Sequence, residues 1–529
     1  MSPRALLRLA ACAVLVLACA ACAGERARSD RTTLIFGRNK DAITLDPALA
    51  FDGISLTTSR AIFEGLTRYK AGTFEVEPAL ATSWSMSADG RSWTFRLRHG
   101  VRFQDGTLLD ADAVKFNFDR WRDAHNPYHA WGYFTYYLGQ FGGFPGLING
   151  VDAVAPDTVR IRLQEPLAPL LADLAMPAFG IASPAALRRE RERFAQAPVG
   201  TGPYKLVEWA HDDHITLERF DGYWGAAPRI ERVILRDIPD AATTILLLQR
   251  GDIDGWEFPT PDGLTQLAHD PRLRIYHQPA NSVMFLAFNT RRHPFDDVRV
   301  RRALSLAIDR TSLVRHFFDP TAQVAVEFLP EAVWPHGVPM DDRYDPTAAK
   351  RLLAQAGFPR GFATTLWFMT APRPYLPEPQ RVAEAIQADL AAVGVNARLQ
   401  GLEWAVFIQK VQDAQHDMCV IGWTGDNGDP DNFTYMPLDR DNAVPPAASN
   451  VTFWSDERFH ALVTQARHVD DVPRRQALYR QALEIASDQA PLAAIAHTTP
   501  PIVFRADLRG YVPSPDSSIY YQDLSFAER

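Results

Sequence analysis

Residues 417–433 read DMCVIGWTGDNGDPDNF. The first seven letters, DMCVIGW, predict a buried strand, and the turn residues that follow predict that it ends there. Three aspartates, Asp426, Asp429 and Asp431, lie on the loop behind this strand. So much negative charge on a stiff, kinked loop is typical of a metal site, an acid–base pair or a site that holds a cation.

The sequence around this stretch alternates between strand and helix patterns. Strands are predicted over 281–290, 363–369 and 395–403, and helices over 298–318, 378–394 and 404–414. Such alternation predicts a mostly parallel sheet with helices on both faces. In sheets of this kind the ligand site lies beyond the carboxyl ends of the strands, where the aspartate loop is expected.

A positive group follows a neighbouring strand in the same way. The loop APRPYLPEP (371–379) comes directly after the strand 363–369 and carries Arg373 between two prolines. Right-handed crossovers bring such strands close together, so we expect Arg373 and Asp426 at the same edge of the sheet.

The spacing of the aspartates argues against a metal site. An EF-hand loop that began at Asp426 would need a glutamate where Pro437 stands, and one that began at Asn427 would need it at Leu438. The histidine pair His125 and His129 is interrupted by a proline and does not form a helical ligand pair. We therefore expect neither a metal nor a cofactor.

Enzyme signatures are also missing from the sequence. It contains no G-x-S-x-G elbow, no Walker A loop, no GxGxxG after a strand and no cysteine–histidine arrangement around Cys419. Asp429 and Asp431 are better interpreted as turn-forming residues, whereas Asp426, directly past the strand, is interpreted as a ligand contact. We expect a protein that is not an enzyme, with an exported hydrolase as the remaining alternative of that class.

The N-terminus predicts export. Two arginines, an apolar run and small residues make up a signal peptide over 1–21, and Cys22 follows as the expected lipidation site, with Cys19 as a rival. Cleavage without lipid is a further alternative. With Cys12 also in the signal peptide, Cys419 is the one cysteine left for the folded body, where no internal disulfide can form.

The remaining composition describes a large soluble body. The 529 residues carry 63 acidic against 55 basic side chains, a net charge of −8 that argues against nucleic acid as a partner. Antiparallel strands are predicted over 74–118, with a helix capped by Asp110, and a strand pair over 199–220. A helix stopped by Gly251 is predicted within 239–256. The aromatic, Gly-rich stretch 131–155 predicts a surface loop.

Several stretches together resemble the dipeptide-binding branch of the peptide/nickel (family 5) extracellular solute-binding lipoproteins, which serve ATP-driven importers. They are GWTGDNGDPDNF (422–433), FNTRRHPFDDVRVRRALSLAIDR (288–310), VGTGPYKLVEW (199–209), IPDAATTILLLQRGDID (238–254), PALATSWSMSADGRSWTFRLRHGVRFQDGT (78–107) and DGYW (221–224). Their order and spacing extend over residues 33–521.

The resemblance implies an α/β fold: a two-lobed, three-domain clamp of the periplasmic-binding-protein type. It implies the signal peptide over 1–21, a lipid-anchor linker over 22–32, domain I in three pieces (33–64, 199–280 and 497–529), domain II over 65–198 and domain III over 281–496.

The resemblance also implies a site. In dipeptide binders of this family, the aspartate that matches Asp426 pairs with the ligand ammonium, and the arginine that matches Arg373 pairs with the ligand carboxylate. Trp423, Thr424 and Gly425 of the same motif are expected near the ligand. The chain differs from relatives at LAFDGI (49–54) and after residue 433, where a cysteine pair is missing, so the side-chain selectivity stays open.

The implied function is capture of dipeptides, or other short peptides, and delivery to a transmembrane permease with cytoplasmic ATPases. The same scaffold with haem, glutathione or longer peptides is the alternative. We expect a monomer, exported to the periplasm or cell surface and held at a membrane by the lipid on Cys22.

Overall fold

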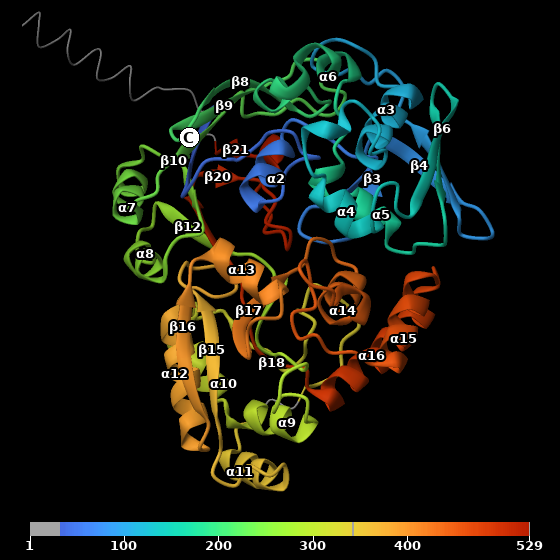
Figure 1. Ribbon diagram of the computed structural model, residues 1–529. Helices are drawn as coiled ribbons and strands as arrows, with labels where there is room; N and C mark the ends of the chain where they lie inside the picture. Colours follow the sequence, from blue (N-terminus) through green and yellow to red (C-terminus); the bar gives the residue numbers. More distant parts are fainter. Residues whose placement is uncertain (1–31, 341–342, 528–529) are drawn as a thin grey trace, which may run out of the picture.

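The computed structural model describes residues 32–340 and 343–527, which form two lobes, one above the other in Figure 1. The large lobe contains a seven-stranded and a four-stranded sheet, and the small lobe contains a six-stranded sheet. This confirms the α/β, two-lobed fold. The candidate lipidation sites Cys22 and Cys19 and the signal peptide lie outside the described residues.

The seven-stranded sheet organises the large lobe around its first strand. β1 (Thr33–Arg38) is a buried central strand that pairs in parallel with β10 and β11, so the three strands end at the same edge. The order is β12 (Leu273–His277), β19 (Pro501–Arg505), β11 (Gly255–Glu257), β1, β10 (Arg232–Asp237), β9 (His214–Arg219) and β8 (Tyr204–Ala210).

The second sheet of the large lobe has its own hydrophobic core. Its antiparallel order is β4 (Ala81–Met86), β5 (Ser92–Leu97), β7 (Thr158–Leu163) and β6 (Ile148–Ala155). A two-stranded sheet joins β2 (Thr67–Tyr69) to β3 (Val76–Pro78), and another joins β20 (Leu508–Arg509) to β21 (Ser525–Phe526). The helices of this lobe are α2 (Gly53–Ser59), α3 (Ala111–Arg122), α4 (Thr135–Phe141), α5 (Leu170–Leu174), α6 (Pro184–Glu190), α7 (Ala241–Arg250) and α8 (Pro261–Leu267). As the sequence predicts, Asp110 caps α3 and Gly251 ends α7.

The sheet of the small lobe is mixed. Its order is β14 (Gln323–Val324), β18 (Leu492–His497), β13 (Ser282–Phe288), β17 (Met418–Thr424), β15 (Ala363–Met369) and β16 (Asn396–Leu402). β15 runs parallel to both β16 and β17, but β13, β14 and β18 pair antiparallel. The prediction of a mostly parallel sheet is therefore wrong, because β13 and β18 are the two strands by which the chain enters and leaves this lobe in opposite directions.

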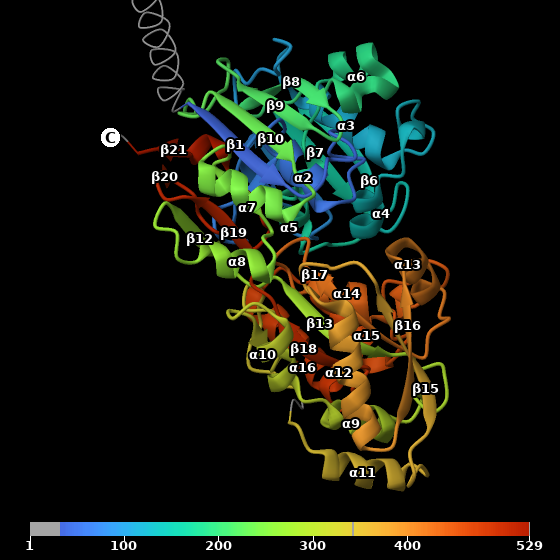
Figure 2. The ribbon, with the colours of Figure 1, turned by 90° about the vertical axis from the view of Figure 1, so that its left-hand side faces the viewer.

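Helices cover the small-lobe sheet, and α12 packs against β15 and β16 (Figure 2). The single helix predicted over 298–318 is two helices. Ile308 ends the first in an extended conformation, and the carboxylate of Asp309 accepts from the backbone N–H of Ser312 to begin the second. The helices are α9 (Val298–Ala307), α10 (Arg310–Phe317), α11 (Pro346–Gln355), α12 (Pro379–Ala392), α13 (Trp404–Gln412), α14 (Asp431–Leu438), α15 (Glu457–Arg467) and α16 (Val472–Gln489).

Two adjacent chain segments connect the lobes. One leads from β12 to β13 and the other from β18 to β19, and the backbone N–H of Gln278 donates to the carbonyl of Pro500 between them (3.0 Å). Two short segments side by side form a hinge about which one lobe can turn against the other. The exact domain boundaries stay a prediction.

The stretch 131–155 differs from its prediction as a surface loop. It contains α4 and all of β6, and the rings of Phe134, Tyr137 and Phe141 are buried in the core of the four-stranded sheet. Burial of three large rings outweighs the loop preference of the glycines around them. Among the described residues, no helix is both long and apolar enough to cross a membrane.

Candidate ligand-binding site

The loop after β17 is fastened to the hinge. The backbone N–H of Gly425 donates to the carbonyl of Asn281 (2.8 Å), and the side-chain amide of Asn281 donates back to the carbonyl of Gly425 (2.7 Å). A Cβ at position 425 would lie 2.5 Å from the ring of Phe433, so only glycine allows this close approach. Gly425 thus has a structural role: its hydrogen bonds to Asn281 fix the position of the next residue, Asp426.

Asp426 is half-buried and is held by neutral groups. The hydroxyl of Tyr136 donates to its Oδ1 (3.1 Å), and the side-chain amide of Asn432 donates to its Oδ2 (3.2 Å). Within 32–340 and 343–527, no cationic side chain lies within ion-pair distance of it. Burial raises the pKa of Asp426, and its two hydrogen bonds oppose the rise. A carboxylate of this kind is poised to accept a cation.

Tyr136 lies on the opposite lobe. It belongs to α4, which stands at the lower edge of the large lobe above α14 (Figure 1). Its hydrogen bond to Asp426 therefore joins the two lobes at the candidate site. Sequence reasoning missed Tyr136, because the aromatic and Gly-rich pattern around it predicts a loop.

Asn432 is a second residue that the sequence did not single out as functional. Its Oδ1 accepts from the indole N–H of Trp423 (3.1 Å) and from the backbone N–H of Asp426 (3.1 Å). Trp423 is partly exposed at the end of β17, and Thr424 beside it is exposed. Trp423 therefore helps to position Asn432, which in turn holds Asp426.

The other two aspartates of the loop are locked by arginines. Asp429 makes a bidentate pair with Arg475 (both N–O distances 2.8 Å), and Asp431 lies 3.1 Å from Nε of Arg467. Asp429 also accepts the backbone N–H of Asp431 at the start of α14. Their interpretation as structural residues agrees with this geometry, but the arginine partners were not foreseen from the sequence.

Arg373 is the positive group of the site. Its guanidinium lies over the ring of Trp404, 3.8 Å from the centroid, and its Nε is buried without an acceptor in the part of the chain that the structure describes. Burial lowers the pKa of Arg373, while nearby Tyr375 and Glu403 act in the opposite direction. Among the described residues no carboxylate lies within ion-pair distance, so this cation is free to bind an anion.

The sheet brings these two charges to the same edge. β15 and β17 are parallel neighbours, with Leu366 opposite Met418. Near the end of β17, a Cβ at Gly422 would clash with the ring of Tyr375, so the loop after β15 packs directly on β17. An unpaired cation and a carboxylate without a cation thus follow adjacent strand ends, as expected from the sequence.

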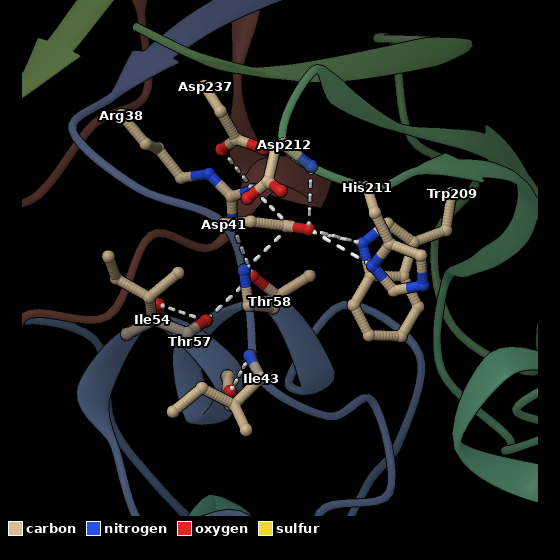
Figure 3. A network of polar contacts seen from close by, with 12 residues as sticks. Arg38, Asp41, Ile43, Ile54, Thr57, Thr58, Trp209, His211, Asp212 and Asp237 are labelled. Carbon is tan, nitrogen blue, oxygen red and sulfur yellow. Dashed lines mark hydrogen bonds and ion pairs between the residues drawn. The ribbon is translucent and has the colours of Figure 1, made fainter. Parts of the chain in front are cut away.

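The large lobe contributes the loop 39–52, between β1 and α2, to the region around the candidate site. Figure 3 shows how Arg38, at the end of β1, binds Thr58 of α2 (2.8 Å) and Asp237 (3.1 Å). Asp41 accepts from the indole of Trp209, and burial raises the pKa of Asp237 to about 6. This network anchors both ends of the loop 39–52 that separates β1 from α2.

The tip of that loop lies beside Tyr136. Leu49 packs so closely on Gly132 that a Cβ there would clash, and the charge of Asp52 contributes to the raised pKa of Tyr136. Phe51 is 59% exposed, and Asp52 caps α2. The stretch LAFDGI (49–54) therefore lies near the candidate site.

One cluster has donor types that suit a metal: Asp439, Asp441 and His460. Nδ1 of His460 lies 3.0 and 3.1 Å from the two oxygens of Asp439, whose Oδ1 also accepts the backbone N–H of Asp441. These contacts already join the histidine to the carboxylate. The cluster follows the C-terminal end of α14, whereas Asp426 precedes its first turn.

Comparisons with known proteins agree with this architecture. Residues 75–444 match the family of bacterial extracellular solute-binding proteins, family 5. The chain is 35% identical to the dipeptide-binding protein of Escherichia coli strain K12, over 93% of this chain and 94% of that protein. It is 34% identical to haem-binding protein A of Haemophilus influenzae, over 97% of each.

A solved structure gives the same result for the fold. The dipeptide-binding protein of Pseudoalteromonas sp. SM9913 in complex with Met-Leu superposes with a TM-score of 0.82 at 29% identity, covering 93% of this chain and all of that one. The chain therefore belongs to family 5 of the bacterial extracellular solute-binding proteins, which is a family of binding proteins rather than of enzymes.

Proposed function

From its membership of this family, we propose that the chain is the exported substrate-binding protein of an ABC importer and that it captures dipeptides. The observation that carries the proposal is the pair of complementary charges at adjacent strand ends. Among the described residues, Asp426 has only neutral partners and Arg373 has no carboxylate within ion-pair distance. The names of the dipeptide-binding relatives support the same ligand class.

The two charges suit the two ends of a free peptide. The ammonium of the ligand pairs with Asp426, and its carboxylate binds the planar guanidinium of Arg373 in a directional, bidentate way. A dipeptide spans about 7 Å at ~3.3–3.6 Å per residue, so two fixed opposite charges select its length. When the lobes close over the ligand, each terminal charge needs its partner, because an unpaired buried charge is costly.

Trp423, Thr424 and Gly425 complete the proposed site with different roles. Gly425 allows the tight turn, Trp423 supports Asn432, and the exposed Thr424 is available to contact the ligand. Charges at the two ends leave the ligand side chains free, which suits a binder of many dipeptides.

The proposal includes the cellular setting. The chain is exported, held at a membrane by lipid on Cys22, and delivers its ligand as a monomer to permease subunits with cytoplasmic ATPases. More than one acyl chain on the cysteine gives stable membrane anchoring, because each CH₂ group buried in the bilayer contributes about 0.8 kcal/mol. Loss of detergent partitioning in Cys22→Ala would support this anchor, and unchanged partitioning would favour Cys19 or no lipid.

Haem is the second candidate ligand, because haem-binding protein A is about as similar to the chain as the dipeptide-binding protein is. Glutathione and longer peptides belong to the same alternative. Unlike a dipeptide, these ligands do not require both terminal charges to be held at a fixed separation.

Isothermal calorimetry with a matched ligand panel tests the proposal. We expect Ala-Ala and Met-Leu to bind, and their N-acetylated and C-amidated forms to fail because each lacks one terminal charge. A binding loss of at least about thirtyfold corresponds to the ~2 kcal/mol expected for one unpaired charge. If tripeptides, haem, glutathione or amidated dipeptides bind as tightly as free dipeptides, the two-charge site is wrong.

A further inference from the structure

The lobes also meet further along the loop that carries Asp426, around Asp173 on α5 of the large lobe. Its Oδ1 accepts from the side-chain amide of Asn427 on the small-lobe loop (2.7 Å), and Asp173 is only 1% exposed. Nearby, the backbone N–H of Ala168 donates to the carbonyl of Arg467 (2.7 Å). Asp173 is therefore covered by the small lobe, and opening the clamp would remove that cover.

The charges around Asp173 do not balance. Asp429 is paired with Arg475, and Asp431 with Arg467, so both guanidinium groups already have a carboxylate. Asp173 is a third carboxylate at the same place and has no cation within ion-pair distance in the described chain. With all three ionised, the buried group would carry one excess negative charge.

A hydrogen-bond acceptor is also left over. Oδ1 of Asp431 is buried and has no donor among the residues that the structure describes. Burial, followed by the charge of Asp431, raises the pKa of Asp173 well above its ordinary value, and burial raises that of Asp431 to about 6. One proton would remove the excess charge.

Two tyrosines near these three carboxylates do not provide this proton. Tyr69 on β2 and Tyr479 on α16 have pKa values raised well above 10 by burial, so both stay neutral. On the exposed rim of the same contact, His468 lies 3.3 Å from Glu165 of the large lobe. This rim pair is the remaining titratable contact between the lobes here, and any test must separate it from Asp173.

We propose that closure of the clamp takes up one proton, which is held by the buried carboxyl group of Asp173. The open form exposes Asp173 to water and releases the proton. Ligand capture, which requires closure, is then favoured by acid, and ligand release is favoured by alkaline conditions. The ligand affinity of this binding protein would then depend on the pH outside the cytoplasm.

The sign follows from linkage. A carboxyl whose pKa is higher in the closed form than in the open form stabilises closure while it is protonated, and this contribution is lost as the pH rises through the closed-form pKa. Between the two pKa values, the Kd should rise by up to about tenfold per pH unit. Asp426 acts in the opposite direction, because it must be ionised to hold an ammonium group.

The variant Asp173→Asn separates these effects. Asparagine is neutral at all pH values and keeps an oxygen for the amide of Asn427, so it imitates the protonated form. We expect the wild-type Kd for Ala-Ala to rise more steeply between pH about 6 and 9 than that of Asp173→Asn, because loss of the ligand ammonium at about pH 8 weakens binding to both proteins equally. Calorimetry in two buffers of different ionisation enthalpy should show greater proton uptake by the wild type than by Asp173→Asn, because uptake by the ligand amine is common to both.

The variant Glu165→Gln is the matched control for the rim pair. At a pH of about 8, above the ordinary imidazole range, this variant should take up as many protons as the wild type. Equal pH profiles and equal proton uptake in wild type and Asp173→Asn would overturn the proposal, and so would loss of the uptake in Glu165→Gln.

A second measurement keeps the test independent of the proposed ligand. Spin labels at Leu108→Cys and Val444→Cys, exposed sites on the two lobes, report the lobe separation without ligand. The closed fraction should decrease with rising pH in the wild-type background and less so with Asp173→Asn. If no dipeptide binds, the proposed function fails, and identical separations in both backgrounds would then overturn the proton proposal by itself.

Discussion

Asp426 and Asp429 lie three residues apart on one loop, yet their surroundings differ in kind. Asp429 is buried and receives both arms of Arg475 together with a backbone N–H. Asp426 is half-buried and receives one hydroxyl and one amide, both neutral. Both positions are aspartates in a turn-rich sequence. From the sequence alone, their roles can be distinguished only by their distance from the end of β17.

The difference distinguishes a structural charge from a functional one. A buried carboxylate with its own guanidinium has its charge compensated inside the protein, and removing either partner harms the fold. A carboxylate with only neutral donors has capacity left for a cation from outside. Variants of Asp429 and of Asp426 should therefore affect different properties of the protein, stability in the first case and ligand affinity in the second.

The largest effect is expected for Asp429→Asn. The substitution removes the carboxylate that pairs in a bidentate way with the buried guanidinium of Arg475, and breaking a buried ion pair typically costs about 3–5 kcal/mol of folding free energy. Urea unfolding should show this as a lower midpoint. Ligand affinity of the folded protein should change less than its stability.

The double variant Asp429→Asn with Arg475→Met is the control for that experiment. Removing both charges should recover much of the stability, because the penalty arises from the unpaired guanidinium. An unchanged unfolding midpoint in Asp429→Asn together with a collapse of binding would show that Asp429, rather than Asp426, holds the ligand.

The next largest effect is expected for Asp426→Asn, on affinity. The ligand ammonium would be buried without a partner, at a cost of about 2–5 kcal/mol, or roughly 30- to several-thousandfold in Kd. Stability should stay within about 1 kcal/mol, since a neutral amide replaces a carboxylate that burial disfavours. Calorimetry and thermal unfolding measure the two quantities.

Asp488→Asn is a matched control, because Asp488 is an exposed aspartate of α16 with only a loose contact to Arg302. It should leave the affinity unchanged. If Asp426→Asn binds dipeptides like the wild type, then the ammonium of the ligand is held elsewhere.

The sequence predicts the strand-end geometry because that geometry is local. The run DMCVIGW and the turn behind it identify β17 and its end, and ATTLWFM does the same for β15. Their parallel pairing then places Asp426 and Arg373 at one edge, as the crossover argument expects. Helix caps such as Asp110 also follow from a single residue and its neighbours.

Long-range partners could not be predicted in this way. Tyr136 is 290 positions from Asp426, and Arg475 is 46 positions from Asp429, and no periodicity connects either pair. The Gly-rich pattern around Tyr136 even predicts a loop. The structure differs because tertiary packing buries the aromatic rings of this stretch, and the sequence pattern does not show that packing. The mixed pairing of the small-lobe sheet likewise depends on where the chain crosses the hinge.

A smaller effect is expected for Tyr136→Phe. The hydroxyl makes the one described hydrogen bond from the large lobe to Asp426, and hydrogen bonds to charged groups contribute about 1.5–3 kcal/mol. The affinity should fall by roughly ten- to a hundredfold. Tyr133→Phe is the control, because Tyr133 lies three residues away and is 89% exposed. Equal affinities of the two variants would show that Tyr136 does not help to hold Asp426.

The smallest effect is expected for Trp423→Phe. The indole N–H donates to Oδ1 of Asn432, which also accepts the backbone N–H of Asp426, so Asn432 keeps a partner when the indole is lost. A neutral hydrogen bond contributes about 0.5–1.5 kcal/mol, which corresponds to roughly a two- to tenfold increase in Kd.

This last variant decides what the indole of Trp423 does. If it acts only through Asn432, Trp423→Phe should weaken all dipeptides by the same factor, because the position of Asp426 matters equally for each. If the ring contacts the ligand directly, the loss should instead depend on the ligand side chains and be larger for apolar ones such as Met-Leu than for Ala-Ala. A loss as large as that of Asp426→Asn would contradict the supporting role, and Trp423 would then be a direct ligand contact.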